Sequence, residues 1–81
     1  MSGRLVLIEW LDAYSAESGW KTEDVLVAQR PIKIKSVGYI AADDPMFITL
    51  ASSIAADGDM DGDITIPRGM VVEIRDLEIK T

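Results

Sequence analysis

The sequence contains no cysteine and no histidine. Without cysteine the chain forms no disulfide, and without either residue a structural zinc site has no credible ligands. The commonest neutral-pH base and the thiol nucleophile are missing too, and there is no GxSxG sequence or glycine-rich phosphate loop. We therefore predict a binding protein and not an enzyme, with no catalytic residue, no metal and no cofactor.

Positive charge is scarce as well, because 8 lysine and arginine residues stand against 14 aspartate and glutamate residues, a net charge of −6. An acidic chain repels the nucleic-acid polyanion, so a duplex partner is not expected. No run reaches the roughly 18 apolar residues of a membrane span. Glu9 interrupts the apolar run after Arg4, so nothing resembles a signal peptide. These features predict a soluble cytoplasmic protein with no membrane partner.

The chain is short for its apolar content, with 81 residues of which 48% are hydrophobic. We expect a single domain over residues 1–81. A chain of this size buries only about 60% of its unfolded surface. The apolar surplus therefore predicts a homo-oligomer, since a β-domain with open edges closes readily on copies of itself.

Alternating apolar residues and turn residues predict five strands and one short helix. We expect strands over residues 5–11, 32–41, 46–54, 64–66 and 71–77, and a helix over residues 23–29 that begins after Thr22. A one-turn break over residues 67–70 separates the last two strands. That order is typical of SH3-like and Sm-like barrels. The sequence thus predicts a mainly β fold, a small five-stranded SH3-like or Sm-like barrel with one short helix.

Three positions carry more detailed expectations. Trp10 has the inward register of the first strand and is expected in the core. Gly38 interrupts the second strand and indicates a bulge or a close backbone approach. In the last strand, Val72 and Ile74 are expected to be the inward pair.

The acidic segment from Asp57 to Asp63 follows the start of a calcium-binding loop, with aspartates at positions one, three and five and Gly62 at position six. Position twelve is Arg68, where calcium requires a bidentate glutamate. The flanking segments are also typical of strands and not helices. We therefore favour a solvated hairpin loop that turns at Asp-Gly, with weak calcium binding as the alternative.

A group of basic and aromatic residues is the candidate binding site. Lys33 and Lys35 share one face of the second strand, and Arg30 lies at its entrance. Such a cluster in an acidic protein can neutralise a phosphate or carboxylate, and aromatic rings can stack on a ligand. Alternatively, the lysines are a solvated strand face that protects an edge from aggregation. The candidate ligand-binding residues are Trp20, Arg30, Lys33, Lys35, Tyr39 and Arg68.

Several short patterns together resemble a group of short, uncharacterised proteins of tailed bacteriophages and prophages. They are Glu9-Trp10-x-Asp12, Gly19-Trp20, Ser36-Val37-Gly38-Tyr39 before Asp43-Asp44, Ile48-x-Leu50-Ala51-Ser52 and Ile64-x-Ile66-Pro67-x-Gly69-x-Val71-x-x-Ile74. The resemblance runs from about residue 9 to residue 77, with the exception of the acidic loop, and carries no catalytic or binding residues with it. It implies a viral accessory protein that acts in the cytoplasm of the host cell.

Two functions follow as expectations from the charge, the absences and this resemblance. The first is a counter-defence protein that binds and sequesters a small anionic ligand, such as a nucleotide immune signal, as an oligomeric sponge. The second is a protein-interaction module that inhibits a host enzyme, for which nucleic-acid mimicry through its acidic surface is one route. On the assembled oligomer, a recessed basic pocket favours the first function, and a continuous acidic face favours the second.

Overall fold

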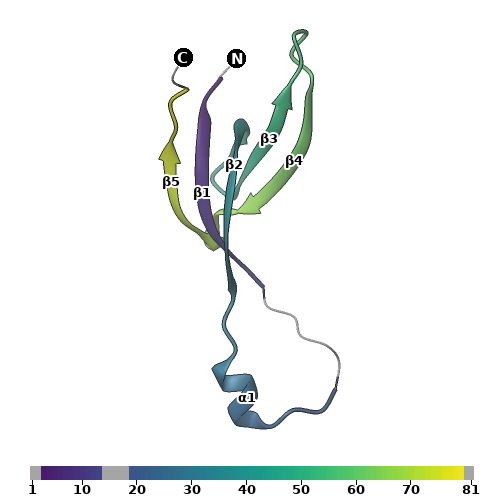
Figure 1. Cartoon of the computed structure of the whole chain (residues 1–81), viewed down its shortest axis with the longest axis vertical. Coiled ribbons are helices and arrows are strands. Elements are labelled where there is room, and N and C mark those ends of the chain that lie inside the picture. Colours follow the sequence, from purple (N-terminus) through teal and green to yellow (C-terminus); the bar gives the residue numbers. More distant parts are fainter. Residues whose placement is uncertain (1–2, 14–18, 80–81) are drawn as a thin grey trace.

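The computed structural model describes residues 3–13 and 19–79, which form one open antiparallel sheet and a projecting arm (Figure 1). The strand order is β4-β3-β2-β1-β5. The elements are β1 (Leu5–Asp12), α1 (Glu23–Ala28), β2 (Ile32–Asp43), β3 (Phe47–Ile54), β4 (Met60–Pro67), the 3-10 turn η1 (Arg68–Met70) and β5 (Val71–Asp76). The mainly β prediction is confirmed, including the single turn between the last two strands.

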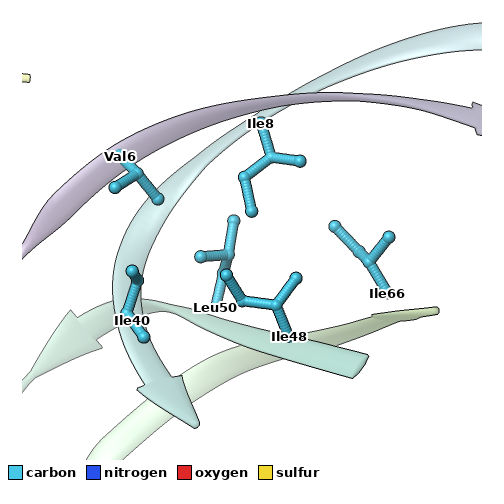
Figure 2. Close-up of a cluster of buried hydrophobic side chains, with 6 residues drawn as sticks. All are labelled: Val6, Ile8, Ile40, Ile48, Leu50 and Ile66. Atoms are coloured by element: carbon cyan, nitrogen blue, oxygen red, sulfur yellow. The ribbon is translucent and has the colours of Figure 1, made fainter. Parts of the chain in front are cut away.

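The hydrophobic core lies between β1 and the strands β2, β3 and β4 (Figure 2). Alternation in β1 turns Val6 and Ile8 inward, where both are fully buried. Trp10, predicted for the core, is half-buried and packs against it, and its indole Nε1 donates a hydrogen bond of 3.0 Å to Ser36 Oγ. The six core residues are Val6, Ile8, Ile40, Ile48, Leu50 and Ile66.

Strand β4 begins at Met60, earlier than the sequence pattern indicates, so the prediction that the acidic segment up to Asp63 is a loop is wrong. Asp61 pairs with Ser53 and Asp63 with Ala51. Both aspartates are exposed, so a strand conformation leaves their carboxylates in water at no desolvation cost. The connecting turn contracts to the residues between Ile54 and Met60.

The inward pair of β5 also differs from the prediction, because Val71 and Ile74 pack against the core, whereas Val72 is 53% exposed. A register shift between Glu9 and Trp10 in the β1–β5 ladder is the cause. An extra residue at such a shift breaks the simple alternation that sequence periodicity assumes.

Gly38 is where the backbone of β2 approaches β3 closely. The residue is buried, and a Cβ there would lie 2.9 Å from the carbonyl oxygen of Ala51. The predicted close approach is therefore confirmed. The register shift in β2 lies farther along, between Ile40 and Ala42.

The arm, residues 11–13 and 19–33, extends beyond the sheet and carries α1 at its end (Figure 1). Pairing of β1 with β5 stops at Trp10, and pairing of β2 with β3 starts only at Tyr39. The molecule measures 53 × 27 × 21 Å, with a radius of gyration of 16.3 Å. A compact domain of this length has a radius of gyration of about 12 Å. The chain is therefore much more extended than a compact domain of the same length.

Candidate functional site

The arm begins as a two-stranded ribbon, in which Leu11 pairs with Lys33 and Asp12 with Ile32. Helix α1 follows Thr22, which occupies the N-cap position in extended conformation but makes no side-chain capping hydrogen bond. The helix ends at Ala28, one residue before the predicted end. Pro31 lies shortly beyond it and disfavours helical backbone in the preceding residue.

Four of the six residues of helix α1 are apolar, and none of the six is buried. Val25, Leu26 and Val27 are 49%, 52% and 66% exposed, and Ile32 in the ribbon is 47% exposed. These residues were not among the sequence candidates. A signal for them was present, because three consecutive apolar residues point around more than one face of a helix, and one core cannot bury them all.

Trp20, a predicted ligand contact, lies just before α1 and is fully exposed. Arg30, another candidate, lies just after the helix. Its Nη1 donates hydrogen bonds of 2.7 Å to the carbonyl of Val27 and 2.8 Å to that of Gln29. Arg30 therefore closes the C-terminal end of α1, where carbonyl groups lack helical partners and a cation interacts favourably with the helix dipole.

The two candidate lysines alternate along β2, on the face opposite the core, which we call the outer face. Lys35 lies opposite Glu9, and its Nζ is 3.6 Å from Glu9 Oε1. Lys33 lies opposite Leu11, and no ion-pair partner is found for it within residues 3–13 and 19–79. Tyr39 is half-buried farther along the same face, between Leu5 and Ala51.

Arg68, the sixth candidate, lies in η1 and has partners of its own. Its Nη2 forms an ion pair with Asp43, and its Nε donates a hydrogen bond of 3.2 Å to the carbonyl of Asp44. Its backbone N–H donates to the carbonyl of Met46 at 3.0 Å. Arg68 thus joins η1 to the β2–β3 turn. The structure places Trp20, Arg30 and Lys33 on the arm, and Lys35, Tyr39 and Arg68 on the sheet.

Two exposed ion pairs perturb their carboxylates. Arg4 Nε donates to Asp76 Oδ1 at 2.6 Å, and this hydrogen bond lowers the pKa of Asp76 below its ordinary value. Arg75 Nε donates to Glu73 Oε1 at 2.9 Å and lowers the pKa of Glu73 in the same way. Arg4 directly precedes β1 and the other three residues belong to β5, so both contacts lie outside the arm.

Residues 57–59 of the acidic segment lie in the turn between β3 and β4, and its remaining residues belong to β4. The N–H of Asp59 donates to Asp57 Oδ1 at 3.0 Å, and the N–H of Ala55 donates to the carbonyl of Asp59 at 2.7 Å. Gly58 has a φ of +97°, which other residues rarely adopt. These contacts are those of a hairpin turn. In the described part of the chain, no three acidic side chains gather closely enough to hold a metal ion.

Neither a pocket nor a membrane-spanning helix occurs in the part of the chain that the structure describes. No protein-family model, no curated protein and no solved structure matches this chain. The candidate site is therefore an exposed surface on the arm, and its chemistry has to be argued from its own residues.

Proposed function

We propose that this protein is a non-enzymatic interaction module that binds a target protein through its arm. The observation that supports the proposal is the apolar surface of α1, a helix of six residues with none buried. Isolated helices shorter than about 12 residues are marginal in water. A partner that covers Val25, Leu26 and Val27 would stabilise the helix by removing their apolar surface from water.

The distribution of charge supports a basic target surface. Residues 36–67 include six aspartates and no lysine or arginine. A surface of one sign attracts a complementary partner and steers its approach. A host enzyme that handles nucleic acid has a basic surface, so inhibition by mimicry of the polyanion fits this acidic stretch. An accessory protein of a tailed phage or prophage would act in this way.

The second candidate is sequestration of a small anionic ligand, such as a nucleotide immune signal, by an oligomer of this chain. It is favoured by Trp20 and Lys33, which lie on the same arm with an exposed ring and an ammonium group free of carboxylate contacts in the described residues. A ring and a cation together suit a base and its phosphate. The open surface of a single copy gives such a ligand little enclosure, so this function requires a second chain.

We also propose that the sheet is the curled sheet of an SH3-like or Sm-like barrel. The support is the placement of β5 beside β1, the turn η1 between β4 and β5, and the contact of the Arg68 N–H with Met46. This architecture would leave the edge of β4 and the arm available for partners.

Leu26→Asp tests the arm. The matched control is Val72→Asp on β5, since Val72 is 53% exposed and Leu26 is 52% exposed. Each tagged protein is used to capture targets from a lysate of the host cells. We expect a stoichiometric protein to be captured by the wild type and by Val72→Asp and lost with Leu26→Asp. Equal capture by all three proteins would remove the arm from the proposal.

Native mass spectrometry of freshly purified protein distinguishes the two candidates. Added mass of a few hundred daltons per site, lost on denaturation, supports the small anionic ligand. Protein without added mass, combined with arm-dependent capture of a polypeptide, supports the interaction module.

A further inference from the structure

Several strand edges have no partner within residues 3–13 and 19–79, among them one side of β2 before Tyr39 and the outer sides of β4 and β5. Between Ile32 and Gly38, β2 pairs with β1 on one side, but β3 joins the other side only at Tyr39. Strand β4 is the outermost strand of the sheet described by residues 3–13 and 19–79, so its far side is also open. Open edges present rows of N–H and C=O groups that accept a further strand.

The side chains on the β2 and β4 edges complement each other. Lys33 and Lys35 are two residues apart on β2, and Asp61 and Asp63 are two residues apart on β4. All four belong to the outer face, because residues paired across a ladder share a face. Lys33 and Lys35 lie on the same face of β2 as Tyr39. Tyr39 pairs with Ala51 of β3, and Ala51 pairs in turn with Asp63 of β4.

We propose that two copies of the chain associate by antiparallel pairing of β2 of one copy with β4 of the other. Lys33 then lies opposite Asp63, and Lys35 lies opposite Asp61. On the other face, Ile32 lies opposite Ile64 of the second copy, which covers two apolar side chains that are 47% and 38% exposed. Ile34 lies opposite Gly62, which has no side chain to obstruct it.

The strand directions make this contact reciprocal. Strands β2 and β4 are both antiparallel to β3, so they run the same way within one copy. A twofold rotation about an axis normal to the sheet reverses the second copy and makes its β4 antiparallel to β2 of the first. The same rotation brings β4 of the first copy to β2 of the second. The interface is thus isologous, and the assembly closes at two copies.

The exposed surface of the chain is large enough for such an interface. Its accessible area is 6235 Å², whereas a compact monomer of 8.9 kDa exposes about 4,800 Å². Each chain therefore exposes roughly 1,400 Å² more than a compact monomer of the same mass. A standard stable interface covers about 800 Å² of each partner. An interface of that standard size covers less than this excess.

This inference goes beyond the proposed target binding and uses a different surface, so either can fail alone. It also competes with the small-ligand alternative at two residues, because Lys33 and Lys35 would be neutralised by aspartates of the second copy. A dimer with no affinity for the target would support the pairing and contradict target binding by the arm. A monomer that binds the target would do the reverse.

Charge reversal tests the pairing. In Lys33→Glu/Lys35→Glu, both ladders of the homodimer place glutamate opposite aspartate, and in Asp61→Lys/Asp63→Lys both place lysine opposite lysine. We expect a wild-type dimer by analytical ultracentrifugation, and dimerisation weakened about tenfold or more in each variant, since like charges directly opposite are destabilising. Mixed together, the two variants should form a heterodimer, because all four pairs are then complementary.

The matched control is Glu23→Lys/Asp24→Lys, which reverses two exposed carboxylates on α1 and should leave the dimer unchanged. A cross-linking experiment fixes the register and does not depend on charge. The chain has no cysteine, so Lys35→Cys mixed with Asp61→Cys should give a disulfide-linked dimer under mild oxidation, while Lys35→Cys mixed with Asp57→Cys should not. A monomeric wild type at tens of micromolar, or equal cross-linking of both mixtures, would overturn the proposal.

Discussion

The sheet and the arm are built from the same apolar residue types but use them in opposite ways. Ile8 and Leu50 in the sheet are 0% and 1% exposed, whereas Ile32 and Leu26 in the arm are 47% and 52% exposed. The strands of the sheet fold over a common core, so each apolar side chain finds neighbours. The helix of the arm has none of its residues buried.

This difference separates the part of the chain with a buried core from the part whose apolar residues stay exposed, which we propose binds another molecule. A core of β-branched and leucine side chains stabilises the sheet by removing apolar surface from water. The arm gains little of that stabilisation in a single copy. Its apolar residues are therefore better explained by binding than by folding, and three pairs of substitutions and one single substitution test this comparison.

The largest contrast is expected between Leu50→Ala and Leu26→Ala. Loss of a fully buried leucine removes contacts and leaves a cavity, so Leu50→Ala should lower the free energy of unfolding by about 2–5 kcal/mol. Leu26→Ala should change it by less than about 0.5 kcal/mol. Urea unfolding at one protein concentration measures both. A large loss with Leu26→Ala would show that the arm packs within its own fold.

Gly38→Ala tests whether the sheet depends on the close approach of β2 and β3. The added Cβ would lie 2.9 Å from the Ala51 carbonyl oxygen, so we expect a loss of about 1–3 kcal/mol from overpacking. The control is Gly69→Ala in η1, where a Cβ meets no atom within 4 Å. Equal thermal stability of the two variants would mean that the close approach of β2 and β3 is not needed for folding.

The two tryptophans offer a smaller contrast. Trp10→Phe removes the hydrogen bond to Ser36 and should cost about 1 kcal/mol. Trp20→Phe should leave the unfolding free energy unchanged because the ring is fully exposed. In Trp10→Phe, the emission of Trp20 reports the arm alone, and a blue shift on target binding would show that the ring is covered.

The smallest effect is expected at the exposed ion pair of Arg4 and Asp76. Because folding lowers the pKa of Asp76, its ionised form adds stability above the unfolded pKa, and this is lost as the pH falls through the folded pKa. Asp76→Asn should be slightly less stable than the wild type at pH 7, with the difference vanishing in acid and shrinking in concentrated salt. A difference that grows in acid would contradict the assigned ion pair.

Much of the fold could be predicted from alternation and turn residues. The strand at residues 5–11, the helix after Thr22 and the break at Pro67 follow from local sequence, because each depends on periodicity, capping position or a proline. The start of β4 could not be predicted, because aspartates and glycines disfavour a strand locally and only pairing with β3 holds them in one. The inward position of Val71 depends on a register shift that no periodic pattern contains.

The candidate site divides along the same line. The sequence grouped Trp20, Arg30 and Lys33 into one candidate binding site because their side chains are aromatic or basic, and all three lie on the arm. It also grouped Tyr39 and Arg68 with them, although Arg68 is held by Asp43 and Asp44. Convergence of side chains from different strands depends on register and bending, which spacing along the chain does not report.

The sequence by itself determined the chemistry available to this protein: no thiol, no imidazole, an excess of carboxylates and enough apolar residues for a small β core. These properties are fixed by residue type and hold in any fold. Only the tertiary structure decided which apolar residues remain exposed and which strand edges remain open. Burial and edge pairing depend on where strands separate, and before Tyr39 β2 has no β3 partner and belongs to an arm whose apolar residues the described part of the chain leaves exposed.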